Sequence, residues 1–232
     1  MSRFPVRYAG WMARDLALGP GVPIVGLTAL VTLFLTSTQI ETNLAGGLQL
    51  IAVWVLYFNA WAVTLLATAG SVSGDRAGGY YRTLFAHPVS PPLFYLQRWL
   101  LGGALVLAAS AVAGAAVAAR LQAPALWFDL VVRTALVYLV LGGLVLFCST
   151  LVRRDWLLAL AILAANAVLG VLASGPIARA IDLLLPPVGL LLPSRALPAG
   201  GALLYVALYG LGLLAGAMVI IQRRPLASGA RE

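Results

Sequence analysis

Lysine is absent from this 232-residue sequence, and cysteine and histidine occur once each, as Cys148 and His87. A phosphate-binding loop that ends in Gly-Lys-Ser or Gly-Lys-Thr needs lysine, so the chain carries no such ATPase motif. One cysteine and one histidine cannot supply a disulfide framework or a Cys/His zinc site. Because no apolar segment carries a His/Ser couple or two facing carboxylates, we expect a non-catalytic chain that binds no metal or cofactor.

Charged residues are also scarce. They make up 9% of the chain, against about a quarter in soluble domains, while hydrophobic residues make up 62% and the mean hydropathy is +0.99. A membrane-crossing helix needs about 20 apolar residues, and six runs approach or reach that length. The sequence therefore predicts an all-α integral membrane protein, with one membrane domain over residues 1–232 and six transmembrane helices. The six runs are Val22–Ile40, Leu48–Ala69, Gln97–Ala119, Phe128–Thr150, Trp156–Leu172 and Gly201–Ile221.

The fifteen basic residues are all arginines, and they outnumber the seven acids to give a formal charge of +8. If the loops alternate across the membrane, eleven arginines fall on the side that holds both termini and four on the other side. Membrane proteins concentrate basic residues in their cytoplasmic loops. The charge therefore indicates membrane topology and not a nucleic-acid surface, and it predicts a multi-pass protein of the cytoplasmic (inner) membrane with both termini in the cytoplasm. The four outer arginines are Arg120, Arg133, Arg179 and Arg195.

Residues 1–20 carry an amphipathic pattern before the first apolar run. Apolar side chains recur at helical spacing on one arc and three arginines on a neighbouring arc, which is typical of an interfacial helix that lies on anionic headgroups. Asp15 interrupts the apolar arc, so a solvated N-terminal turn is the alternative. The apolar arc is Phe4, Tyr8, Trp11, Met12 and Leu16, and the basic arc is Arg3, Arg7 and Arg14.

Residues 177–198 are apolar but hold four prolines, which exclude a straight helix. Each apolar piece is too short to cross a bilayer. The pattern predicts a re-entrant hairpin of two short helices that enters the outer leaflet and returns before the last span. The alternative, a seventh span, would move Arg224 to the outer side and is disfavoured. The prolines are Pro186, Pro187, Pro193 and Pro198.

The loop after the second run, residues 71–90, reads SVSGDRAGGYYRTLFAHPVS. Asp75 favours a helix N-terminus, and Leu84 and Phe85 supply an apolar patch. Pro88 would stop the helix before the third run begins. These features predict a short amphipathic helix on the cytoplasmic side, with an ordinary basic loop as the alternative.

This loop resembles the cytoplasmic coupling segment of the ABC type-2 permease family. In that family the segment forms a helix that docks on an ATPase. Its sequence has an acidic start containing Arg, then a Gly, an apolar stretch and a closing Pro-Val-Ser. The sequence departs from the pattern at Ala77 and Arg82, where acids are common, and at Tyr80, where Thr is common. The matching residues are Asp75, Arg76, Gly79, Leu84, Phe85, Pro88, Val89 and Ser90, and the resemblance implies ATPase coupling through Asp75, Arg76, Gly79, Arg82, Leu84, Phe85 and Pro88.

Three further features agree with that family across nearly the whole chain. They are the six spans, the broken hairpin before the last span and the final Gln-Arg-Arg that follows that span. The resemblance implies a dimer of permeases, identical or related, in the lipid bilayer, with two ABC ATP-binding subunits beneath it that hold ATP and Mg²⁺. It implies that this chain couples ATP hydrolysis in those subunits to export of an unidentified, amphipathic substrate. The alternatives are a haem-exporter-type membrane subunit, a membrane-embedded enzyme of lipid or peptide metabolism, and a membrane scaffold for a cytoplasmic complex.

Four aromatic residues of the second run recur at i, i+3, i+4 and i+7 and therefore share one helix face. Helix packing is one interpretation, and the wall of a substrate path is the other. Two asparagines near the middle of their runs would each need a polar partner in lipid. The predicted pathway residues are Trp54, Tyr57, Phe58, Asn59, Trp61 and Asn166.

Small residues crowd the third run between positions 108 and 114, and the sixth run holds Gly212 and Gly216 in a G-x-x-x-G pattern. Both patterns permit close helix contact. We expect them to pack within the chain and not at a dimer seam.

Overall fold

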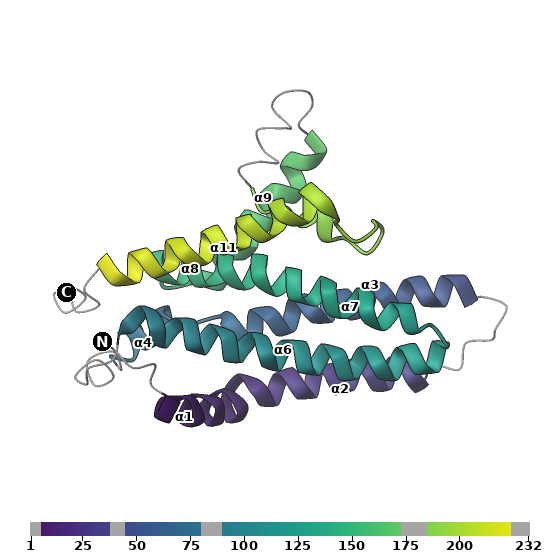
Figure 1. The fold of residues 1–232 in the computed structure, drawn as a ribbon, viewed down its shortest axis with the longest axis horizontal. Helices are drawn as coiled ribbons and strands as arrows, with labels where there is room; N and C mark the ends of the chain where they lie inside the picture. Colours follow the sequence, from purple (N-terminus) through teal and green to yellow (C-terminus); the bar gives the residue numbers. More distant parts are fainter. Residues whose placement is uncertain (1–5, 38–44, 80–89, 173–184, 224–232) are drawn as a thin grey trace.

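The computed structural model describes residues 6–37, 45–79, 90–172 and 185–223, and within these ranges the chain is helical with no strands (Figure 1). The membrane-type, all-helical fold that composition predicts is confirmed at this level. The elements are α1 (Val6–Leu16), η1 (Ala17–Gly21), α2 (Val22–Ser37), α3 (Ala45–Thr68), α4 (Ser73–Ala77), α6 (Pro91–Leu121), α7 (Pro124–Val137), η3 (Tyr138–Gly142), α8 (Gly143–Leu151), α9 (Asp155–Leu172), η4 (Val188–Leu191) and α11 (Gly200–Arg223).

Five helical runs are long and apolar enough to cross a membrane. A sixth helix, α9, corresponds to the predicted fifth span but has a shorter apolar stretch, Asp155–Leu169. The described part of the chain thus supplies five to six candidate spans, as the apolar runs predict. The five are Gly10–Ser37, Leu50–Ala77, Pro91–Leu121, Pro124–Leu151 and Gly200–Arg223.

The first span begins earlier than its sequence suggests. Between α1 and α2 the backbone passes through η1, a five-residue π-helix that contains Pro20. Leu16 and Val22, which flank this segment, both have right-handed helical dihedral angles. Pro20 has no N–H to donate to the preceding turn, and a π segment accommodates this without ending the helix. The helix therefore continues from α1 into α2, where the sequence predicts an interfacial helix over residues 1–20 and a separate span from Val22.

The residues of the apolar arc of α1 differ in burial. Met12 and Leu16 are buried, whereas Trp11 is exposed. Met12 packs in a cluster with Val72 and Phe94 and so joins the protein interior. Phe4 and the side chain of Tyr8 lie outside the described residues, and the surface position of α1 stays a prediction.

The helices α2, α3, α6 and α7 lie side by side, and α8 and α11 pack along the other edge of this group (Figure 1). Glycine permits the closest approaches. A Cβ atom at Gly114 of α6 would lie 2.7 Å from Cδ2 of Leu130 in α7. One at Gly210 of α11 would lie 2.6 Å from Cγ of Leu139 in η3. The small-residue stretch of the third run therefore packs within the chain, as expected.

The G-x-x-x-G prediction needs a correction. A Cβ atom at Gly212 would meet nothing within 4 Å, whereas one at Gly216 would lie 3.2 Å from the ring of Phe147. The residue that brings α11 closest to its neighbour is Gly210, two positions before the pattern begins. Helical spacing showed that the two glycines share a face but not which face meets another helix.

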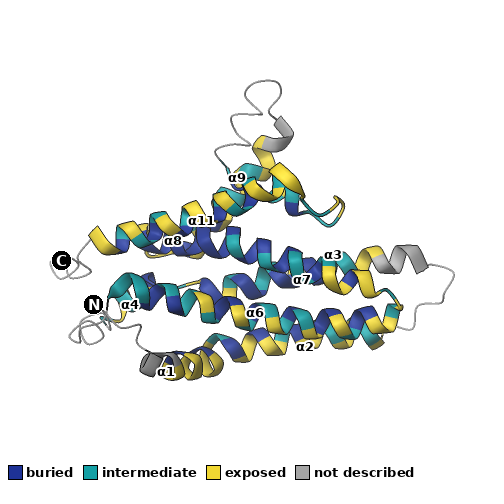
Figure 2. Ribbon diagram, viewed as in Figure 1, coloured by how far each residue is buried: buried dark blue, intermediate teal, exposed yellow. Residues whose placement is uncertain are grey.

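Large apolar side chains are exposed along the outer faces of the bundle (Figure 2). They include Leu30, Leu33 and Phe34 of α2 and Leu204, Leu208 and Leu211 of α11. Apolar residues therefore occupy both the interior and the outer surface. A soluble monomer rarely exposes so much contiguous apolar surface, and lipid is its natural solvent.

The described half of the predicted hairpin contains one short helix, η4, which packs on α7, and Leu191 is buried in a cluster that also includes residues of α7, η3 and α8. Residues 177–184, which would form the first half, lie outside the described residues. Pro186 and Pro187 are buried and precede η4, where they limit it to a single 3-10 turn.

Arg133 is not in an outer loop, where the charge count placed it. It lies within α7, only 4% exposed, and forms an ion pair with Asp129 one turn earlier at 2.6 Å. Its guanidinium also donates to the carbonyl oxygens of Leu192 at 2.9 Å and Arg195 at 2.7 Å. Arg133 therefore fixes the segment after η4 onto α7, and its charge carries no information about loop topology.

Candidate functional site

The start of the predicted coupling segment lies in a tight turn between α3 and α6. Gly70 and Gly79 both have positive φ angles, +72° and +70°, which glycine adopts at little cost. Gly70 ends α3, and Gly79 follows the short helix α4. The turn 69–79 is therefore shaped by its glycines and leaves α4 as a separate five-residue helix.

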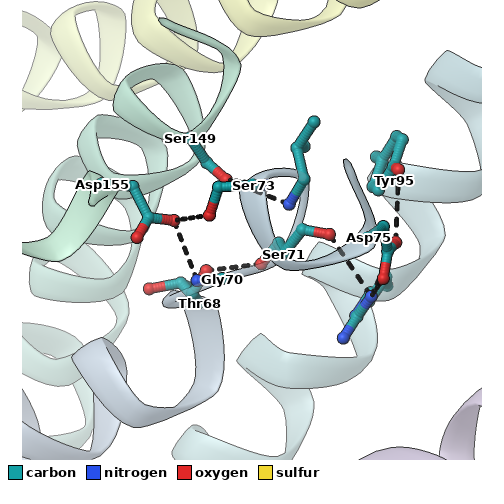
Figure 3. Close-up of polar contacts among 10 residues, drawn as sticks. Thr68, Gly70, Ser71, Ser73, Asp75, Tyr95, Ser149 and Asp155 are labelled. Atoms are coloured by element: carbon teal, nitrogen blue, oxygen red, sulfur yellow. Dashed lines mark hydrogen bonds and ion pairs between the residues drawn. The ribbon is translucent and has the colours of Figure 1, made fainter. Parts of the chain in front are cut away.

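The helices α8 and α9 bind this turn from one side (Figure 3). Oγ of Ser149 accepts hydrogen bonds from the backbone N–H groups of Val72 at 3.0 Å and Ser73 at 2.9 Å. Oδ2 of Asp155 accepts from the N–H of Gly70 at 2.8 Å and from Oγ of Ser73 at 3.1 Å. The first N–H groups of a helix lack partners within it, so Ser149 acts as a cap for α4 supplied by another helix.

Helix α6 binds the turn from the other side (Figure 3). Asp75 forms an ion pair with Arg98 at 3.1 Å and accepts a hydrogen bond from the hydroxyl of Tyr95 at 3.2 Å. Arg98 also donates to the carbonyl oxygen of Ser71 at 3.3 Å. One further bond connects the turn to α8, from Nη1 of Arg76 to the carbonyl oxygen of Thr150 at 3.0 Å. We call this set the polar junction: residues 70–76 with Tyr95, Arg98, Ser149, Thr150 and Asp155.

Asp155 is the most deeply buried charged group of the junction, with 1% of the residue exposed. Its partners are backbone N–H groups and a hydroxyl, and Oδ1 also accepts from the N–H of Trp156 at 2.8 Å. A carboxylate at the first residue of a helix is favoured by the helix dipole. Each hydrogen bond to such a charged group stabilises by about 1.5–3 kcal/mol. Asp155 therefore serves two segments at once, as the first residue of α9 and as an acceptor for the turn.

The predicted coupling residues are only partly within the described chain. Asp75, Arg76 and Gly79 belong to the turn, while Arg82, Leu84, Phe85, Pro88 and the remainder of 80–89 lie outside the described residues. Asp75 was expected to favour a helix start, and it does occupy the first turn of α4. Its described contacts are with Tyr95 and Arg98, which the sequence reasoning did not include.

Sequence reasoning also missed Ser149, Thr150 and Asp155. A weak signal was present, because two hydroxyl residues end a long apolar run and an acid begins the next one. Such residues commonly cap helices. Nothing in the linear order shows that they meet a turn 74 to 85 residues away.

The predicted pathway residues do not converge on one site. The rings of Trp54, Tyr57, Phe58 and Trp61 contact one another in sequence order along α3, with centroids 5.7–6.2 Å apart. Tyr57 is buried against η3 and α8, whereas Phe58 is exposed.

The two asparagines make separate contacts. Nδ2 of Asn59 donates to Oγ1 of Thr28 in α2 at 3.4 Å. Nδ2 of Asn166 donates to the carbonyl oxygen of Pro186 at 2.6 Å. Asn166 thus has a polar partner for its amide N–H, and so does Asn59, whereas the buried Oδ1 of Asn59 has no hydrogen-bond partner among the described residues. The substrate path stays a prediction.

The end of the bundle that holds the polar junction also holds α1, α4, the start of α6 and the end of α11 (Figure 1), and the sequence of these elements and of the α8–α9 connection is rich in arginine. At the opposite end, α6 finishes with Arg120. The described ranges contain no group of three His, Cys, Asp or Glu residues that could hold a metal ion. The arginines of the junction-end segments are Arg14, Arg76, Arg98, Arg153, Arg154 and Arg223.

No family model, curated protein or solved structure matches the chain.

Proposed function

We propose that this protein is the transmembrane subunit of an ATP-driven ABC exporter of the type-2 permease kind, and that it acts without catalytic residues of its own. ATP and Mg²⁺ would be held by separate ATP-binding subunits. The observation that carries the proposal is the polar junction, because it fastens the start of the predicted coupling segment to α6, α8 and α9.

A coupling segment needs firm attachment to the helices that it moves. The turn 69–79 meets this requirement on both sides through buried hydrogen bonds and an ion pair. A force applied to residues 79–90 by a bound ATPase would reach the junction directly. An ordinary solvated loop, the alternative interpretation, has no need for a buried carboxylate such as Asp155 or a cap such as Ser149.

The distribution of charge supports a cytoplasmic position for the junction. Cytoplasmic ends of membrane proteins are enriched in arginine and lysine, and the arginine-rich segments share the junction end of the bundle. An ATP-binding subunit in the cytoplasm would then face the coupling segment. This difference in arginine content between the two ends of the described bundle would favour one orientation of the chain in the membrane.

The cargo is proposed to be amphipathic and to pass between two permease chains, identical or related. The exposed ring of Phe58 continues the aromatic face of α3 outward from buried Tyr57. Aromatic rings offer large apolar contact area, and Trp and Tyr add polar groups at the ring edge. Such a surface suits a molecule with both apolar and polar parts.

Co-purification tests the proposal. The chain is extracted from its native membranes in mild detergent beside the variant Leu84→Asp/Phe85→Asp and the control Ala125→Asp, and ATPase activity and bound proteins are measured. Ala125 is exposed at the end of the bundle opposite the junction. We expect an ATP-binding-cassette subunit with the wild type and the control, and its loss from the double variant. A chain that purifies alone and without ATPase in all three preparations would refute the proposal and favour the scaffold or enzyme alternatives.

A further inference from the structure

The two sides of the polar junction differ in burial and in bond type. On the α8 and α9 side the acceptors are Ser149 and Asp155, exposed by 0% and 1%, and three of the four bonds are to backbone N–H groups. On the α6 side the ion pair joins side chains that are exposed by 15% for Asp75 and 27% for Arg98. The buried hydroxyl of Tyr95 adds a hydrogen bond to Asp75 on this side. Solvent screens a partly exposed ion pair, so the pair itself stabilises the turn less than the fully buried acceptors Ser149 and Asp155 do.

Helix α9 has few other attachments within the described chain. Its first part packs on α8 and on the segment around η4, and Ala159 is fully buried there. From residue 164 to residue 169 the residues are exposed except for Asn166, and the helix leads away from the bundle (Figures 1 and 2). The helix α6, by contrast, packs against α2, α3, α7 and α11.

The geometry makes α9 a lever. Asp155 is its first residue, and the helix has 18 residues, which corresponds to a length of about 27 Å. A tilt of about 10° at the Asp155 end would displace the other end by about 5 Å at that length. A tilt of α6 would instead disturb its packing against four helices.

We propose that Asp155 is a positioning residue that ties α9 to the turn 69–79, so that α9, and not α6, follows movement of the coupling segment. The hydrogen bonds between Asp155 and the turn form within this chain and need no partner subunit. That an ATPase drives the movement rests on the proposed function, and the two parts are tested separately.

Distances between spin labels, measured by double electron–electron resonance, test the tie in the isolated protein. The only cysteine is the buried Cys148, so a Cys148→Ala background accepts two new labels without interference. One pair joins the turn to α9 through Ala77→Cys and Ala165→Cys. The other joins the turn to α6 through Ala77→Cys and Ala104→Cys. All three alanines are exposed.

The two sides of the junction are then broken in turn. Asp155→Leu should broaden the distance distribution of the turn–α9 pair about twofold or more and leave the turn–α6 pair unchanged, because local opening follows the bonds that are lost. Asp75→Asn should do the reverse. Asp155→Asn retains one oxygen acceptor and should give an intermediate width, which guards against misfolding of the leucine variant. A purely structural role would broaden both pairs together, and that result or no broadening with Asp155→Leu would overturn the proposal.

Movement is tested in the complex with the ATP-binding subunit. We expect ATP to shift the turn–α9 distance in Asp155→Leu by less than half of the wild-type shift, with equal recovery of the subunit. An equal shift in both proteins would overturn the assignment of Asp155. Failure to recover any ATP-binding subunit would instead count against the proposed function, and the measurements on the isolated chain would still decide the tie.

Discussion

The contact between α11 and η3 gives a sharp test of the packing, because two glycines of one helix differ in surroundings. A Cβ atom at Gly210 would lie 2.6 Å from Cγ and 2.9 Å from the carbonyl oxygen of Leu139. One at Gly212 would have no neighbour within 4 Å. The variants Gly210→Ala and Gly212→Ala therefore add the same atom to the same helix, with and without an obstacle.

The magnitude follows from the difference between the two variants. Both gain the helix propensity of alanine over glycine, about 1 kcal/mol, and this gain cancels in the comparison. Gly210→Ala must also push apart backbone atoms that a rotamer change cannot move, and overpacking of this kind costs about 1–3 kcal/mol. We expect Gly210→Ala to be less stable than Gly212→Ala by that amount, which is a factor of about 5–150 in the unfolding equilibrium.

The assay is reversible unfolding in mixed micelles, followed by tryptophan fluorescence and by retention of helical circular dichroism. Wild type, Gly210→Ala and Gly212→Ala are measured at the same detergent composition. Equal stability of the two variants would refute the contact between α11 and η3. Greater stability of Gly210→Ala than of Gly212→Ala would mean that another part of α11 faces the bundle.

Three further predictions concern polar contacts. Ser149→Ala removes the acceptor for two N–H groups and should cost about 1–3 kcal/mol, seen as faster hydrogen exchange in the 70–79 peptide; unchanged exchange would contradict the junction. Arg133→Met leaves the partly exposed carboxylate of Asp129 and two carbonyl groups without their donor, and should lower the free energy of unfolding by about 1–3 kcal/mol, whereas Arg133→Met combined with Asp129→Leu should recover part of it. Asn166→Leu removes the bond to the carbonyl of Pro186 and should cost about 0.6–1.7 kcal/mol in thermal unfolding; a gain in stability would show that the bond is not formed.

The helical fold and its five to six candidate spans were accessible from sequence because they depend on local composition. A run of about 20 apolar residues has one stable form in lipid, a helix that satisfies its own hydrogen bonds. The connection between α1 and α2 was not accessible in the same way, because Pro20 lies between the predicted interfacial helix and the first predicted span. The structure accommodates Pro20 in a π segment, which the periodicity of the sequence does not reveal.

The error at Arg133 has a different origin. Counting arginines assumes that each one lies in a loop, but a cation within a helix is stable when an acid one turn away and nearby carbonyls satisfy it. Asp129 provides the acid at i−4, and this pair was visible in the sequence. The carbonyls come from Leu192 and Arg195, about 60 positions later, and these were not visible.

The residues of the polar junction were likewise only partly accessible from the sequence. Asp75 and Arg76 were selected from a local pattern, and the structure places both in the junction. Arg98, Ser149 and Asp155 were not selected, because each is unremarkable among its sequence neighbours. Ser149 and Asp155 matter because they contact a turn that joins two other helices, and Arg98 matters because it contacts the same turn from 23–27 residues later in the chain.

The sequence by itself determined that this protein is helical and apolar, that its positive charge is arginine alone, and that it contains no lysine for a phosphate-binding loop. These properties follow from composition and from short-range periodicity, which any window of the chain displays. Only the tertiary structure decided that Gly210 meets η3, that Arg133 is buried, and that Asp155 and Ser149 bind the turn after α3. The physical reason is that a helix fixes the direction of its side chains, whereas the packing of several helices decides which of those side chains meet.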